Sequence, residues 1–240
     1  MDVLGVIPAR LQSQRLPQKP LLEIRGKPLI QWVYERARDA KALDRLLVAT
    51  DAPEIREAVH RFGGEAILTS RQHASGTDRV AEVAEDLPCT IVVDIQGDEP
   101  LIRADSIDEL VSVMLKDPSL PVATLAAPCG QDELDDPNVV KIACGNGDFA
   151  VYFSRAKVPY FRNGSASHYK HVGVYAFRRA FLLELSRLPV SKLERTEGLE
   201  QLRVLENGHK IKLIFTRHRS IGVDTPEDIR KVAEALGEDS

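Results

Sequence analysis

Residues 7–21 read IPARLQSQRLPQKPL. This stretch follows a short apolar run at 3–7, which predicts a buried strand. It precedes 28–33 (PLIQWV), where a proline in the first turn predicts the start of a helix. The stretch has no acidic residue, and it contains three basic ones, Arg10, Arg15 and Lys19. A cationic loop at the carboxyl end of a strand in an open α/β sheet indicates a phosphate-binding site, although a solvated basic loop would give the same pattern.

Length and composition narrow the possible classes of protein. The chain has 240 residues, of which 43% are hydrophobic, enough for one large α/β domain with a sizeable core. Its net charge of -4 and its 5% of aromatic residues argue against nucleic-acid binding. Its apolar runs are too short to cross a bilayer, and its N-terminus lacks a signal-peptide pattern. Because the three cysteines have no metal-type spacing, we expect reduced thiols in a cytoplasmic protein that contacts no membrane.

The first half of the chain alternates between strand and helix patterns. The predicted strands are 3–7, 45–50, 66–68 and 90–95, and the predicted helices are 29–40, 53–62, 76–85 and 104–115. Such alternation predicts an α/β fold with a doubly wound, mostly parallel sheet. In that fold, ligands gather at the carboxyl ends of the strands.

The pattern changes after Pro121. Two strands predicted at 139–143 and 149–153 flank the turn sequence GNGD, and a further strand is predicted at 170–177. We interpret 139–177 as a β-rich lobe inserted into a single domain that spans residues 1–240. The prediction is completed by helices at 181–188, 193–206 and 225–236 and by a strand at 210–215.

Two further segments carry carboxylates suited to a metal ion. In 94–100 (DIQGDEP), Asp98 follows an apolar strand, and in 222–228 (GVDTPED), Asp224 precedes Thr225, the predicted cap of the last helix. Mg²⁺ prefers oxygen ligands and usually takes one or two protein carboxylates together with phosphate oxygens and water. We therefore predict that Asp98 and Asp224 bind Mg²⁺, while a helix-capping turn is the alternative role of the GDE sequence.

These motifs together resemble the 3-deoxy-manno-octulosonate (Kdo) cytidylyltransferase family of the nucleotidyltransferase superfamily. The resemblance runs from residue 3 to about 236. Besides the segments above, it rests on HxSGTDR at 73–79, YFSRxxxPY at 152–160, KHVGVYAFR at 170–178 and EGLEQLRVLENG at 197–208. One departure is Gln72, where the family usually has Asp before the histidine.

The resemblance implies that the anomeric hydroxyl of Kdo attacks the α-phosphorus of CTP. CMP-Kdo then forms for lipopolysaccharide biosynthesis, and pyrophosphate leaves. The residues implied in catalysis are Arg10, Lys19, Asp98 and Asp224, of which the two basic ones balance charge on the β- and γ-phosphates. The residues implied in nucleotide binding are Pro8, Ala9, Arg10, Lys19, Ser75, Gly76, Arg79, Gln96 and Asp98. No protein nucleophile is needed.

The resemblance also implies which residues contact the sugar acid, namely Gln96, Arg155, His171, Tyr175, Glu200 and Gln201. Arg155 and His171 are the cations expected for the carboxylate of Kdo. Glu200 and Gln201 are expected near the middle of the helix at 193–206, where a carboxylate and an amide would bind sugar hydroxyls. A structural histidine and an exposed helical pair are the alternatives. The family is dimeric, so we expect a homodimer formed through the lobe at 139–177.

Other functions remain open on the sequence alone. Synthesis of CMP-sialic acid is the nearest, although 152–160 and 197–208 favour Kdo, and a relative that uses 8-amino-Kdo is a further alternative. A non-catalytic nucleotide-binding regulator is another class, but the chain retains all four residues implied in catalysis. Two common nucleotide motifs, GxxxxGK[ST] and GxGxxG, do not occur.

Overall fold

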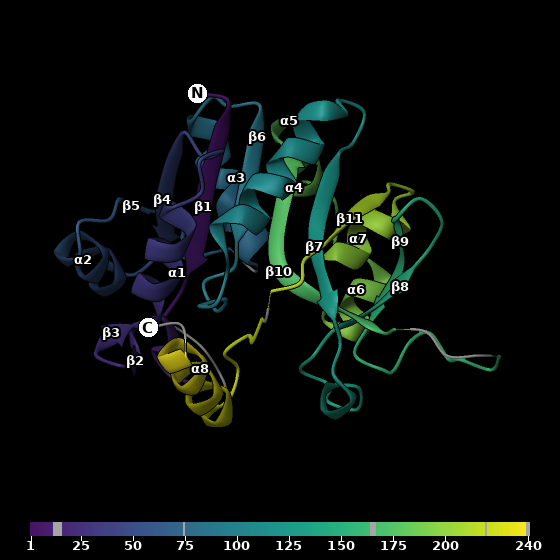
Figure 1. Cartoon of the computed structure of the whole chain (residues 1–240). Coiled ribbons are helices and arrows are strands. Elements are labelled where there is room, and N and C mark those ends of the chain that lie inside the picture. The colour runs from purple at the N-terminus through teal and green to yellow at the C-terminus, as the bar shows by residue number, and fades with distance from the viewer. Residues whose placement is uncertain (12–15, 74, 164–166, 219, 239–240) are drawn as a thin grey trace.

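The computed structural model describes residues 1–11, 16–73, 75–163, 167–218 and 220–238, so Arg15 of the predicted phosphate-binding loop lies outside the described residues. Among the described residues, nine strands form one central sheet (Figure 1). Seven of them follow the order β11 (Ile211–Phe215), β7 (Val122–Pro128), β10 (Tyr169–Arg178), β6 (Ile91–Ile95), β1 (Val3–Ala9), β4 (Arg45–Thr50) and β5 (Ala66–Leu68). β8 (Lys141–Cys144) pairs with β10 and with β9 (Ala150–Ser154), while β2 (Glu23–Ile24) and β3 (Lys27–Pro28) form a separate hairpin.

The sheet is parallel on one side and mixed on the other. β1 runs parallel to β4 and β6, and β4 runs parallel to β5. β10 lies antiparallel between β6 and β7, while β11 runs parallel to β7. The mainly parallel α/β sheet expected from the alternating sequence is therefore confirmed. Because β1 and β6 are parallel neighbours, the loops that follow them leave the same edge of the sheet.

Helices cover both faces of the sheet because its strands carry apolar side chains on both sides. On β1, Val3 and Ile7 belong to one buried cluster, and Leu4 and Val6 belong to the other. The first cluster includes residues of α1 (Leu29–Arg38), α2 (Pro53–Arg61) and α4 (Ala104–Lys116). The second includes residues of α3 (Gly76–Asp86), α5 (Arg179–Leu185) and α7 (Gln201–Glu206). The result is three layers, with the sheet in the middle.

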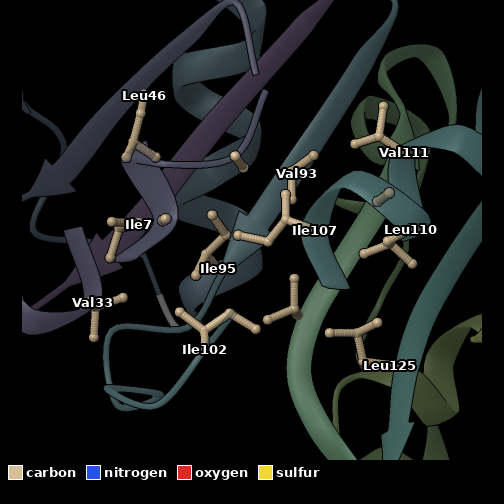
Figure 2. Packing of buried hydrophobic residues seen from close by; sticks show 14 of the residues in the cluster. Ile7, Val33, Leu46, Val93, Ile95, Ile102, Ile107, Leu110, Val111 and Leu125 are labelled. Carbon is tan, nitrogen blue, oxygen red and sulfur yellow. The ribbon is translucent and has the colours of Figure 1, made fainter. Parts of the chain in front are cut away.

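Figure 2 shows the first cluster from close by. In this view Val33 of α1 lies near Ile7, and Ile107 of α4 extends toward Ile95. Full burial of a Val, Leu or Ile side chain stabilises the fold by roughly 1.5–3 kcal/mol. The helices packed on both faces thus hold the strands in place. The loops at the strand ends are not covered by these helices and are available to bind a ligand.

The last helix, α8 (Pro226–Glu238), packs in a separate cluster. Val223 and Val232 contact a small core that contains Leu29 and Leu101. Figure 1 shows α8 beyond the carboxyl end of β1, near the β2–β3 hairpin. Residues 216–218 and 220–225, which lie between β11 and α8, consequently cross the edge where the β1 and β6 loops emerge.

β7 and the helix predicted at 193–206 differ from the sequence prediction. β7 lies where we predicted no strand, because its sequence VATLAAP is rich in alanine and lacks a run of β-branched residues. The helix predicted at 193–206 is divided into α6 (Lys192–Glu197) and α7, since Gly198 ends α6 in a left-handed conformation with φ of 65°. Glu200 is therefore the N-cap of α7 and Gln201 its first residue, not the middle of one helix.

The helices can also be compared with the length that a membrane-spanning helix requires. Within the described ranges, every helix falls short of the length and apolar character that crossing a bilayer requires.

Gly97, in the loop after β6, has no room for a side chain. A Cβ at this position would lie 2.9 Å from the backbone oxygen of Pro8, so Gly97→Ala would push two loops apart. We expect the free energy of unfolding to fall by about 1–3 kcal/mol, measured by chemical denaturation. Gly222→Ala is the matched control, because its Cβ would meet only Glu99 Oε1, at 4.0 Å. Equal losses in the two variants would contradict this explanation.

Candidate active site

Lys19 lies between the two carboxylates that the sequence analysis paired. Its Nζ is 2.7 Å from Oδ2 of Asp98 and 3.1 Å from Oδ1 of Asp224. Burial by itself lowers the pKa of Lys19, but the charges of Asp98 and Asp224 outweigh this effect and raise the pKa above its ordinary value. The ammonium group is therefore the cation that allows the two carboxylates to approach each other.

Local backbone structure brings these three side chains together. Gln18 adopts a left-handed conformation with φ of 55° and starts the short 3-10 helix η1 (Lys19–Leu21). Val223 N donates to the carbonyl oxygen of Asp98 at 2.9 Å, which places Asp224 beside Asp98. Asp228 then accepts from the backbone N–H of Asp224 at 3.0 Å, at the start of α8. The carboxylates thus come from segments that are far apart in the sequence.

Two cavities meet at this centre. The first-loop cavity, of about 860 Å³, is bounded by residues 8–11 and 17–20 and by the start of α3. The sheet cavity, of about 850 Å³, lies over β10 and is bounded by the loop at 132–140 and by residues 198–204. Four residues line both cavities, Gln96, Asp98, Glu200 and Asp224. Two ligands held in separate cavities would therefore meet beside the two aspartates.

The structure brings together all residues predicted for the nucleotide. The first-loop cavity is lined by Pro8, Ala9, Arg10, Lys19, Ser75, Gly76, Arg79, Gln96 and Asp98. The side chain of Ser75 caps α3 by accepting from Asp78 N at 3.1 Å. Arg79 is only 3% exposed, and its guanidinium donates to Asp51 at 3.1 Å and to Thr69. Arg79 thus braces the loops around the cavity, while Arg10 is exposed at its edge.

The residues predicted for the sugar acid also come together. The sheet cavity is lined by Gln96, Arg155, His171, Tyr175, Glu200 and Gln201. Arg155 Nε donates to the carbonyl of Glu197 at 2.8 Å, and its Nη1 donates to the carbonyl of Pro137 at 2.7 Å. The guanidinium therefore joins the loop before β8 to the end of α6, at the rim of the cavity.

His171 differs from the sequence prediction in its charge. Burial lowers the pKa of His171 to about 3, so the imidazole is neutral near pH 7, whereas we expected a cation. Its Nε2 is 3.0 Å from Oγ1 of Thr124, and that hydroxyl donates its proton to the carbonyl of Val174 at 2.8 Å. His171 Nε2 must then be the donor to Thr124. The side chain offers hydrogen bonding and packing, not a fixed positive charge.

Asp94 is a buried acid near the point where the two cavities meet, and we did not predict a role for it from the sequence. Asp94 is fully buried and accepts from Gln96 Nε2 at 2.9 Å. Burial, and then the charge of Glu200, raise the pKa of Asp94 well above its ordinary value. Burial also raises the pKa of Glu200, while hydrogen bonds from Thr77 and Ser75 act against it. An acidic residue inside the apolar strand sequence IVVDI was the signal that could have identified Asp94.

The donor set at the centre fits Mg²⁺ bound together with a phosphate. Asp98 and Asp224 are partly exposed and already share one cation, the Lys19 ammonium. Across the described ranges of the chain, no three His, Cys, Asp or Glu residues form a group that could hold a metal ion alone. Two carboxylates completed by phosphate oxygens and water are a usual arrangement for Mg²⁺.

Comparisons with known proteins show similar sequences over the full length of the chain. The sequence pattern of the family described as Cytidylyltransferase matches residues 4–211. The chain is 46% identical over 243 residues to the 3-deoxy-manno-octulosonate cytidylyltransferase of Fusobacterium nucleatum, covering 100% of this chain and 99% of that protein. It is 49% identical over 247 residues to the protein of the same name from Syntrophobacter fumaroxidans, with the same coverage.

Solved structures show the same similarity. A CMP:2-keto-3-deoxy-manno-octonic acid synthetase complexed with CTP superimposes with a TM-score of 0.93 and 44% identity, covering 100% of both chains. A cytidylyltransferase from Leptospira borgpetersenii shares the fold, with a TM-score of 0.68 and 19% identity over 99% of this chain and 87% of that one.

The neutral state of His171 makes the stability of the fold depend on pH. Below the ordinary pKa of 6.5 the unfolded chain binds a proton at His171 that the folded chain excludes down to about pH 3, so acidification destabilises the fold. As the pH falls from 6.5 to 5, protonation of His171 in the unfolded chain should lower the free energy of unfolding by about 2 kcal/mol. His171→Gln should remove that part of the pH dependence in chemical denaturation at several pH values. Identical pH profiles for the variant and the wild type would contradict the neutral assignment.

Proposed function

The chain belongs to the cytidylyltransferase family, and from this membership we infer that it transfers CMP from CTP to Kdo. The anomeric hydroxyl of Kdo attacks the α-phosphorus of CTP, CMP-Kdo forms, and pyrophosphate leaves. The relatives that match over the full length carry the name of this activity, and the similar solved structure is described as complexed with CTP. The product serves lipopolysaccharide biosynthesis.

The observation that carries this proposal is the charged centre where the two cavities meet. A nucleotide in the first-loop cavity and a sugar acid in the sheet cavity would both reach Asp98 and Asp224. The cationic side chains of Arg10 and Lys19 line the nucleotide side, where negative charge develops on the leaving pyrophosphate. Holding two substrates in adjoining sites replaces a bimolecular encounter with an oriented one.

We propose that Asp98 and Asp224 hold Mg²⁺ when CTP is bound. The ion would stabilise negative charge on phosphate oxygens and acidify the attacking hydroxyl. In the structure, Lys19 balances the charge of both aspartates. Bound CTP would offer Lys19 its phosphate oxygens as new anionic partners. Lys19 would then balance the aspartates without CTP and the phosphates with it.

For the sugar acid, we propose that Arg155 supplies the permanent positive charge. Arginine has five N–H donors, so the bonds from Arg155 to the carbonyls of Glu197 and Pro137 leave other N–H groups for a substrate carboxylate. The neutral His171 would add a hydrogen bond, and Glu200 and Gln201 would accept from and donate to sugar hydroxyls. Tyr175 contacts the His171 ring at a centroid distance of 5.0 Å and would complete the wall.

The proposed activity also suggests where the protein works. CTP is available in the cytoplasm, and we propose that compartment for the enzyme. The three cysteines, Cys89, Cys129 and Cys144, are free thiols in the structure, as is usual in a reducing environment.

We further propose a homodimer formed through the β8–β9 hairpin of the lobe at 139–177. In this lobe, Val140 and Phe149 pack against the clusters of their own chain and are not available to a second copy. Val151 of β9 is 64% exposed, and Tyr160 is 88% exposed on the following loop, so these two side chains are available to a second copy. Sedimentation at micromolar concentration should give twice the chain mass, and Val151→Lys should lower it. A monomeric wild type would contradict the proposal.

Pyrophosphate release tests the proposed reaction directly. We expect the purified chain, with CTP and Mg²⁺, to release pyrophosphate rapidly with Kdo and far more slowly with sialic acid or glucose-1-phosphate. Asp98→Asn and Asp224→Asn should each lower turnover by at least about 10²-fold, because each removes a charge from the centre and keeps its shape.

The matched control is Asp117→Asn, since Asp117 is an exposed residue that bonds to Ser119 away from both cavities. It should keep wild-type turnover. Equal rates with all three acceptors, or full turnover by either site variant, would contradict the proposed function.

A further inference from the structure

A bulge in β10 brings its backbone against the loop that carries Asp98. The register between β10 and β7 shifts between Val172 and Tyr175, and Gly173 lies inside this irregularity. Gly173 N donates to Oε1 of Glu99 at 2.9 Å, and its carbonyl accepts from Gln96 N at 2.9 Å. A Cβ on residue 173 would lie only 3.1 Å from the Gln96 side chain and 3.3 Å from Glu99 Oε1. The bulge and the loop are therefore fitted closely together.

The second carboxylate oxygen of Glu99 holds the segment that leads to α8. Ser220 Oγ donates to Glu99 Oε2 at 2.7 Å. The carbonyl of Ser220 accepts from Nζ of Lys170 at 2.9 Å, and Lys170 in turn pairs with Glu133. Glu99 is 7% exposed and Lys170 is 9% exposed, so little of either side chain is in contact with water. Hydrogen bonds from a charged donor such as the Lys170 side chain are among the stronger ones in proteins.

These contacts decide where Asp224 lies. Between the end of β11 and the start of α8 the chain has no helix or strand in the residues that the structure describes. Its position over the site depends on Ser220, on Val223, and on the cap of α8 at Asp228. Glu99 is the residue that joins the Ser220 anchor to the loop of Asp98. The Glu99–Ser220 bond thereby fixes the segment that carries Asp224 to the loop that carries Asp98.

We propose that Glu99 is a positioning residue that sets Asp224 opposite Asp98 through its two hydrogen bonds. The inference deepens the proposed function, because it says how one of the two aspartates reaches the site. Both oxygens of Glu99 face protein donors, so its role is to hold the backbone and not to react. An error of about 1 Å in such a placement can lower a rate by about 10²-fold.

The test compares three variants in the pyrophosphate assay. Glu99→Ala should lower kcat by about 10²-fold and change the KM for CTP much less, because the first-loop residues 8–10 and 17–20 do not depend on Glu99. Glu99→Gln keeps an oxygen for Gly173 and can donate to the Ser220 hydroxyl, so it should stay within about 3-fold of the wild type. Ser220→Ala should fall between them, by about 10-fold, and it carries the test if Glu99→Ala does not fold.

Two further measurements separate this role from a merely structural one. In the Asp224→Asn background, Glu99→Ala should cause little additional loss, since residues that act through one group are not additive. Asp105→Ala is the matched control, because Asp105 bonds to His218 of the same segment at 2.9 Å, away from Asp224. It should keep the wild-type kcat.

The wild-type rate in this assay tests the proposed function, whereas the ratios among variants test the role of Glu99. The inference would be overturned if Glu99→Gln were as impaired as Glu99→Ala, because charge would then matter and not hydrogen bonding. Full additivity with Asp224→Asn, or an unchanged kcat in Ser220→Ala, would also overturn it.

Discussion

The site depends on one electrostatic constraint, the repulsion between two aspartates that the fold places side by side. At an effective dielectric constant near 20, two like charges about 4 Å apart repel by about 4 kcal/mol. Lys19 offsets this cost, since its Nζ lies within 3.1 Å of both Asp98 and Asp224. The first loop, the β6 loop and the segment before α8 are thereby drawn to one point. A second cation that took over part of the role of Lys19 would therefore enter a site that already binds one positive charge.

The surrounding fold supplies rigidity that a cluster of loops would not have alone. β1 and β6 deliver their loops to one edge, and the bulge at Gly173 of β10 fixes the β6 loop from the other side. On the sugar side the imidazole of His171 is neutral, burial raises the pKa of Glu200, and the guanidinium of Arg155 lies at the rim of the cavity. Arg10 and Lys19 line the nucleotide side, where the proposed reaction releases pyrophosphate.

Much of this arrangement could be predicted from the sequence. Alternating apolar patterns identified the parallel strands, and the motifs around Lys19, Asp98 and Asp224 identified residues that the structure gathers. What the sequence could not show depends on long-range packing. The charge of His171 follows from burial by distant residues, and the break at Gly198 depends on one backbone conformation inside a helical pattern. The role of Glu99 depends on Ser220, a residue that no local pattern connects to it.

The most direct measurement is a crystal structure of the enzyme with CTP in the presence of Mn²⁺, a substitute for Mg²⁺ that anomalous scattering can locate. We expect an anomalous peak in contact with the carboxylates of Asp98 and Asp224, and Lys19 Nζ turned toward phosphate oxygens. A peak held by phosphate oxygens alone, with Lys19 still bridging both aspartates, would contradict the proposed role of this charged centre.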